Sequence, residues 1–227
     1  MDKVALVTGA NRGIGLEVCR QLAERGYTVV LGSRDLSKGE AAARGLTGEV
    51  IPKQLDVTRQ EDVDALAGWV ENEYGCLDAL VNNAAIDYDQ DQNVLSADLG
   101  RVSRAFEANT LGPWRTAQAF VPLLRRSEYP RLVNVSSGAG SLKGMSGGTP
   151  AYSLTKAALN ALTIMLANQL KADGVLVNAV GPGWTATDMG GGGRPISEGA
   201  ASVVWAVTLE DSGPTGGFFR DGEQVPW

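Results

Sequence analysis

The alternation of short apolar runs with longer amphipathic runs constrains the fold of this chain most strongly. Apolar runs typical of buried strands occur at residues 4–7, 28–31, 50–55, 77–81, 131–135, 174–180 and 217–219. Between them lie runs with helical periodicity, at residues 14–25, 36–46, 60–74, 99–126, 152–172 and 198–209. Strand–helix alternation predicts βαβ units, and continuously apolar strands predict burial on both faces. We therefore expect one α/β domain over residues 1–227, with a doubly wound parallel sheet of about seven strands between helices.

Composition excludes several functional classes. The net charge of −6 argues against a nucleic-acid partner, and no apolar run approaches the roughly 20 residues that span a membrane. The N-terminus shows no secretory signal, and Cys19 and Cys76 are interpreted as reduced thiols, so we expect a cytoplasmic protein. The chain has no histidine, which removes Ser-His-Asp and Cys-His catalysis and histidine metal sites. No metal is expected, and a general acid must be Tyr, Lys, Asp, Glu or Cys.

A glycine-rich turn follows the first predicted strand and leads into a helix. Its sequence is Thr8-Gly9-Ala10-Asn11-Arg12-Gly13-Ile14-Gly15. Glycines allow a close approach to a pyrophosphate, and a helix N-terminus offers free N–H groups to it. The spacing G-x-x-x-G-x-G departs from the usual dinucleotide pattern G-x-G-x-x-G, and a purely structural turn is the alternative. Its position predicts nucleotide binding by Gly9, Asn11, Arg12, Gly13, Ile14 and Gly15.

Five further segments follow in a fixed order. They are Asn82-Asn83-Ala84-Ala85, Ala108-Asn109-Thr110, Ser136-Ser137, Tyr152-Ser153-Leu154-Thr155-Lys156 and Pro182-Gly183. With the glycine turn, this series resembles the short-chain dehydrogenase/reductase family from residue 8 to residue 183, although Ala85 replaces the usual glycine. Residues 187–191 and 216–222 look most like the carbonyl-reductase-like members. The resemblance implies an oxidoreductase with a Rossmann-type fold and a nicotinamide cofactor.

Tyr152 and Lys156 form the candidate acid–base pair. Their spacing of four residues places both side chains on one face of a helix, where a lysine cation would lower the tyrosine pKa toward neutrality. The resemblance implies that Ser137, the second serine of its pair, donates to the substrate carbonyl and that Asn109 anchors a water linked to Lys156. Taken singly, Tyr152 and Lys156 are more typical of a solvated helix face and Asn109 of a backbone cap or bridge, and the two serines fit ordinary loop hydroxyls; their order along the chain favours the catalytic reading.

The second strand predicts the cofactor. It ends without an acid for a ribose 2′-hydroxyl, whereas Arg34 and Arg12 suit a 2′-phosphate, so we expect NADP(H). Two exposed surface arginines are the alternative. Asp56-Val57 resembles the segment that contacts adenine, although closing a loop is its other reading. By resemblance, further cofactor contacts are expected from Asn83, Ala84, Tyr152, Lys156, Pro182, Gly183, Thr185 and Thr187.

Reduction of a small aldehyde or ketone is the expected reaction, with Ser137, Tyr152 and Trp184 contacting the substrate. Met145, Ile86 and Tyr88 are further candidate pocket walls. An alcohol dehydrogenase acting in the oxidative direction and a non-enzymatic NADP(H) sensor are the alternatives. We expect a homodimer or homotetramer, because family members often associate through the helices at residues 99–126 and 152–172.

Overall fold

The molecule is built around one eight-stranded sheet of order β3-β2-β1-β4-β5-β6-β7-β8. The computed structural model describes residues 3–227. All neighbouring strands pair in parallel except β7 and β8, which form an antiparallel hairpin. The strands are β1 (Val4–Val7), β2 (Thr28–Ser33), β3 (Val50–Gln54), β4 (Ala79–Asn82), β5 (Arg131–Val135), β6 (Leu176–Val180), β7 (Phe218–Arg220) and β8 (Glu223–Gln224).

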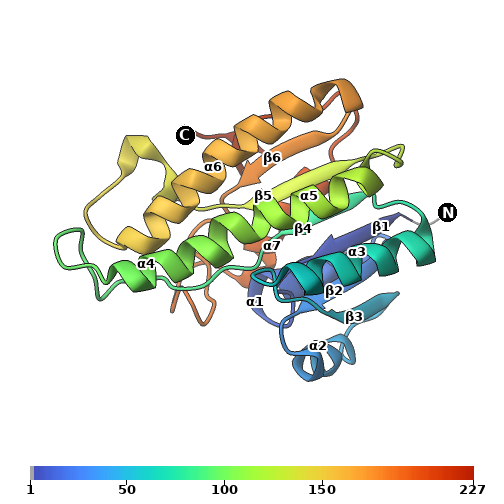
Figure 1. Ribbon diagram of the computed structural model, residues 1–227, viewed down its shortest axis with the longest axis horizontal. Coiled ribbons are helices and arrows are strands. Elements are labelled where there is room, and N and C mark those ends of the chain that lie inside the picture. The colour runs from blue at the N-terminus through green and yellow to red at the C-terminus, as the bar shows by residue number, and fades with distance from the viewer. Residues whose placement is uncertain (1–2) are drawn as a thin grey trace.

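Helices cover both faces of the sheet (Figure 1). One face carries α3 (Gln60–Tyr74), α5 (Gly112–Leu124) and α6 (Pro150–Leu170), and the other carries α1 (Gly13–Ala23) and α7 (Ile196–Val207). At the β3 edge of the sheet, α2 (Leu36–Ala43) packs on β2 and β3. Helix α4 (Leu99–Phe106) packs on α6. Successive strand residues enter opposite cores, because side chains alternate along a strand. Ala5 joins the core under α1 and α7, and Leu6 joins the core under α3 and α5.

The prediction of a doubly wound α/β fold is confirmed, with two local differences. The predicted helix at 99–126 is interrupted between α4 and α5 by a π-helical turn, Glu107–Leu111. The eighth strand was not predicted, since two exposed polar residues show no alternation. Among residues 3–227, no helix has both the length and the apolar character that crossing a membrane requires.

Candidate active site

The glycine turn lies where the strand order reverses. The chain adds β2 and β3 on one side of β1, and β4, β5 and β6 on the other, so the crevice between β1 and β4 is the expected ligand site of such a sheet. Asn83 Nδ2 donates to the carbonyls of Thr8 (2.9 Å) and Gly9 (3.1 Å), and Thr8 Oγ1 accepts from the N–H groups of Asn83 and Ala84 (both 3.0 Å). These bonds join the turn after β1 to the segment after β4.

Two glycines of the turn have no room for a side chain. Gly9 has φ +62°, and a Cβ on it would lie 2.7 Å from Ala84 Cα. A Cβ on Gly15 would lie 2.4 Å from Asn83 Nδ2. Arg12 precedes α1 in an extended conformation without a side-chain cap, so the first N–H groups of α1 remain available to an anion.

A cavity of about 580 Å³ opens over this turn. It brings together most of the predicted cofactor residues: Gly9, Asn11, Arg12, Gly13, Ile14, Gly15, Arg34, Asp56, Val57, Asn83, Ala84, Tyr152, Lys156, Pro182 and Thr187. Gly183 and Thr185 line a smaller neighbouring cavity of about 280 Å³. The adjoining lining of the large cavity includes Ser33, Lys38, Leu55, Thr58 and Ala108, which the sequence patterns did not single out.

Basic groups gather at the β2 end of the large cavity. Arg34 follows β2, and Lys38 lies in the first turn of α2; both line the cavity. Asp35 also lines it, but its carboxylate caps α2 by accepting from Lys38 N (3.4 Å) and Ser37 Oγ (2.7 Å). These bonds hold the Asp35 pKa below its ordinary value, the Ser37 hydroxyl contributing most. The acid that directly follows Arg34 is therefore already engaged, and Asp56, after β3, accepts from Thr58 N (3.0 Å) and Thr58 Oγ1 (2.7 Å).

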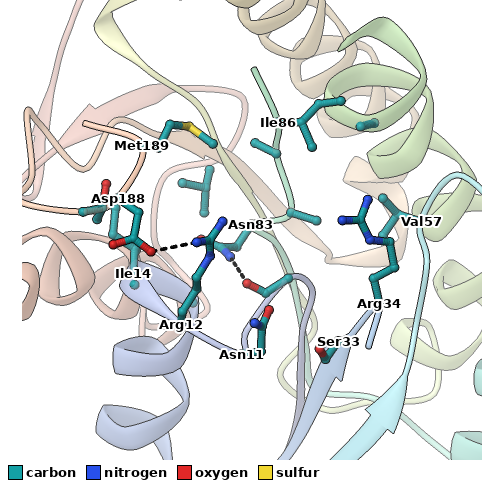
Figure 2. A pocket seen from close by; sticks show the side chains of 18 of the residues that line it. Asn11, Arg12, Ile14, Ser33, Arg34, Val57, Asn83, Ile86, Asp188 and Met189 are labelled. Carbon is teal, nitrogen blue, oxygen red and sulfur yellow. Dashed lines mark hydrogen bonds and ion pairs between the residues drawn. The ribbon is translucent and has the colours of Figure 1, made fainter. Parts of the chain in front are cut away.

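Arg12 and Arg34 lie apart in this structure (Figure 2), and our expectation that both reach one phosphate stays a prediction. Arg12 Nη1 lies 2.7 Å from Asp188 Oδ2, in the loop after β6. Figure 2 shows Arg12 directed to Asp188 on one side of the pocket, with Arg34 on the other side next to Val57. The two partners are 70% and 76% exposed, so this ion pair contributes little stability.

Tyr152 and Lys156 lie one turn apart on α6, inside the large cavity. Lys156 is buried, its Nζ donates to the Val135 carbonyl (2.8 Å), and it lies 5.6 Å from the centre of the Tyr152 ring. Burial lowers the Lys156 pKa to about 8. Burial also raises the Tyr152 pKa to about 12, with the Ser137 hydroxyl acting in the opposite direction and Tyr88 adding to the rise. In the protein without cofactor, burial thus determines the direction of the Tyr152 pKa, and Lys156 is not among the groups that act on it. A lowering of this pKa by Lys156 stays a prediction for the protein with bound cofactor.

The two serines after β5 differ in what their hydroxyls contact. Ser136 is buried, and its Oγ donates to Asn160 Oδ1 (2.6 Å). Ser137 lines the small cavity beside Tyr152; its Oγ accepts from Ala139 N (3.2 Å), and its hydroxyl is directed to Tyr152, whose pKa it acts to lower. This difference favours Ser137 as the donor to a substrate.

Asn109 lies in the π-helical turn and is fully buried. Its Oδ1 accepts from Ile86 N (2.8 Å), and its Nδ2 donates to Ile86 O (3.0 Å) and Thr155 Oγ1 (3.1 Å). Both amide hydrogens are thus engaged, and a water could be bound only through the remaining lone pair of Oδ1. In this structure Asn109 joins the loop after β4 to α6.

The small cavity lies beside Ser137 and Tyr152, and its walls are mainly apolar. Trp184 and Tyr88 line it as expected, together with Met189, whereas Ile86 lines the large cavity instead. Met145 lines neither cavity, so its predicted role is wrong. The loop that carries Met145 is joined to the segment after β4, since Val94 N donates to Gly147 O (3.2 Å).

Comparison with known proteins agrees with this geometry. The model of the short-chain dehydrogenase family matches residues 3–195. The chain belongs to this family. A (+)-neomenthol dehydrogenase of Arabidopsis thaliana is 35% identical, with 98% of this chain and 97% of the relative covered. That alignment extends over 289 positions, more than the 227 residues here, so the relative carries insertions that this chain lacks.

Two carbonyl reductases are similar over nearly the whole chain. Carbonyl reductase [NADPH] 1 of Sus scrofa is 32% identical, with 99% of this chain and 94% of the relative covered. The crystal structure of NADPH-bound carbonyl reductase from chicken fatty liver superposes with a TM-score of 0.88 at 27% identity, covering 100% and 99% of the two chains. This short-chain dehydrogenase is therefore an oxidoreductase of a family that uses nicotinamide cofactors.

Proposed function

We propose that this short-chain dehydrogenase reduces a small aldehyde or ketone to the alcohol with NADPH, in one catalytic domain over residues 1–227. The observation that carries the proposal is the position of Tyr152, which lines both cavities. One of these cavities contains the glycine turn and the other contains Ser137 and the apolar walls. A proton donor at this junction suits transfer between a bound dinucleotide and a small carbonyl compound.

The residues present fit NADP(H). The turn that follows β1 has no space for a Cβ at Gly9 or Gly15, and the N-terminus of α1 is uncapped, which suits a pyrophosphate. Arg34 and Lys38 offer cations where a 2′-phosphate would lie, while the carboxylate of Asp35 is engaged with α2. The NADPH named for the chicken liver structure is consistent with this choice.

In the proposed reaction, Tyr152 gives its phenolic proton to the carbonyl oxygen and Ser137 donates a hydrogen bond to the same atom. When bound, the nicotinamide supplies the hydride that the carbonyl carbon accepts. Donors that are fixed before the reaction are effective, because negative charge grows on that oxygen in the transition state. A Tyr152 pKa of about 12 keeps its proton in place at neutral pH. Lys156 would stabilise the phenolate that remains, and Asn109 would bind a water that returns a proton through Lys156.

Cofactor choice separates the first alternative from the proposed function. An alcohol dehydrogenase acting in the oxidative direction would use the same residues, with Tyr152 as the base, whereas use of NADPH favours reduction. A sensor has no need of the buried Lys156, whose burial is costly. We further propose a homodimer or homotetramer that forms through the surfaces of α5 and α6.

The test is the absorbance of NADPH and of NADH, followed separately against aldehydes, ketones and quinones. The Tyr152→Phe variant is run in parallel, and cofactor binding is measured by fluorescence. We expect NADPH consumption by the wild type, a loss of about 10²-fold or more in the variant, and unchanged NADPH binding. Equal use of NADH would contradict the roles of Arg34 and Lys38. Binding of NADPH without turnover would favour the sensor.

A further inference from the structure

One charged side chain lines the small cavity. The remaining lining residues are apolar, aromatic, glycine or hydroxyl residues, and none is Asp or Glu. The charged residue is Arg220, the last residue of β7. Because the chain carries a net charge of −6, a cation placed here differs in sign from the molecule as a whole.

The hairpin that ends β7 directs Arg220 toward this cavity. Asp221 and Gly222 have φ +54° and +82°, which is the conformation of a tight type I′ turn, and the turn pairs Arg220 with Glu223 across the two strands. A Cβ built on Gly138 would lie 3.1 Å from Arg220 Nη2. The guanidinium therefore lies against the residue that directly follows Ser137.

Neighbouring carboxylates leave this guanidinium without an ion-pair partner. Asp221 pairs through both oxygens with Arg194 (2.8 Å each), which is the main cause of its lowered pKa. Within residues 3–227, no Asp or Glu oxygen lies within 4.0 Å of an Arg220 nitrogen. The fixed cation thus remains available to an anion from solution.

Arg220 is too far from the predicted phosphate sites to serve the cofactor. It lines only the small cavity, whereas the glycine turn and Arg34 line the large one. The strands that carry Arg34 and Arg220, β2 and β7, are separated by β1, β4, β5 and β6. At about 4.8 Å per strand spacing, this places the 2′-phosphate end roughly 24 Å away.

We propose that the substrate is a small carbonyl compound that also carries a carboxylate, and that Arg220 binds this carboxylate. The inference rests on the proposed reductase function. The carboxylate is bound and not changed; only the carbonyl gains a hydride and a proton. Guanidinium matches carboxylate geometry with two parallel hydrogen bonds, and Trp184 and Met189 offer apolar surface beside it for the remainder of the substrate. The volume of about 280 Å³ limits the substrate to a small molecule.

The experiment compares two aldehydes of similar size, 4-carboxybenzaldehyde and its uncharged methyl ester, with NADPH. The proteins are the wild type, Arg220→Ala, Arg220→Lys and the control Arg125→Ala, whose arginine pairs with Asp173 (2.8 Å) outside the cavities. We expect kcat/KM of the wild type to favour the acid about tenfold over the ester, through a lower KM. Arg220→Ala should remove this ratio and leave kcat/KM for the ester unchanged. Arg220→Lys should keep part of it, and Arg125→Ala should keep all of it.

Salt gives a second measurement: with NADPH kept saturating, 0.5 M NaCl should lower kcat/KM for the acid more than for the ester. An equal acid-to-ester ratio in the wild type and Arg220→Ala, with the ester reduced, overturns this inference and leaves the reductase function standing. If neither aldehyde nor any other carbonyl compound in the panel is reduced while NADPH binds, the proposed function fails and this inference fails with it.

Discussion

Asp89 holds the start of the helix that carries Tyr152, and replacing it should be costly. Its side chain is fully buried; Oδ2 accepts from Ala151 N (2.9 Å), and Oδ1 accepts from Tyr152 N (3.0 Å). No local residue can do this. Pro150 has no N–H, and Thr149, with φ +48°, provides no side-chain cap to these groups. The first free N–H groups of α6 are therefore bound by a carboxylate about 60 residues earlier in the chain.

The expected magnitude follows from these two bonds. A hydrogen bond to a charged group contributes about 1.5–3 kcal/mol, so the pair contributes about 3–6 kcal/mol. Removing the carboxylate also removes the cost of burying it, which brings the expected loss in Asp89→Ala to about 3 kcal/mol. The control is Asp98→Ala. Asp98 caps α4 by accepting from Gly100 N (2.8 Å) at an exposed site, and its loss should cost about 1 kcal/mol.

Urea unfolding followed by circular dichroism measures both values, and NADPH turnover tests the consequence for catalysis. Because one of the two bonds fixes the backbone of Tyr152, kcat should fall about tenfold in Asp89→Ala, corrected for folded protein, with unchanged NADPH affinity. In Asp98→Ala, kcat should not change. The reasoning is refuted if Asp89→Ala unfolds at the same urea concentration as Asp98→Ala, or if its kcat equals that of the wild type.

Three further predictions follow from the site. Gly15→Ala should lose about 1–3 kcal/mol of stability and bind NADPH more weakly, because the new Cβ would meet Asn83. The control Gly68→Ala, at an uncrowded position of α3, should gain about 0.5–1 kcal/mol. Thermal unfolding of both variants measures these changes in stability. Arg34→Ala should raise KM for NADPH about tenfold and leave KM for NADH unchanged, as steady-state kinetics would show. Loss of the Lys156 proton (pKa about 8) should add stability between pH 8 and pH 10, since the unfolded chain still holds that proton. Burial raises the pKa of Cys19 and of Tyr152, which lowers stability over the same range, so the comparison is between proteins: in urea unfolding the wild type should gain about 2 kcal/mol relative to Lys156→Met from pH 8 to pH 10, and an identical pH dependence in both would refute this role of Lys156.

Local motifs allowed most of the site to be predicted. The glycine turn and the Tyr152–Lys156 pair each depend on spacing within a few residues, and both lie in one cavity. The direction of the Tyr152 pKa could not be predicted in this way. Spacing reports that a lysine is near, but it does not report that both side chains are desolvated by strands and loops distant in sequence.

Residues brought in by long-range packing left no signal in the sequence. Arg220 reaches Gly138 from β7, and Asp89 reaches α6 across more than 60 residues. Asp89 is a polar residue in a loop, which is ordinary. Arg220 lies in the segment 216–222 noted in the sequence, but a polar residue at the end of a short strand gives no indication of which cavity it lines. Lys38, in the first turn of α2, was a missed position with a local signal, because it lies four residues after Arg34, just beyond the strand whose end usually carries the ribose contact.

The loops around the small cavity are held to very different degrees. The loop after β4 is bonded at Ile86 by Asn109 and at Asp87 by Arg101, whose Nε donates to both carboxylate oxygens (2.7 and 2.8 Å). The same loop carries Tyr88, whose ring contacts the Tyr152 ring edge-on, with centroids 5.0 Å apart.

The loop after β6 forms the opposite wall. Its base is held by Arg194, whose N donates to Trp184 O (2.9 Å) and whose guanidinium pairs with both oxygens of Asp221 (2.8 Å each). Its segment around Asp188 is joined to the glycine turn by the exposed pair of Arg12 and Asp188, which is weak. The partly buried bonds of the β4 loop hold Tyr88 beside Tyr152, so we expect any opening that admits cofactor or substrate to involve the segment around Asp188.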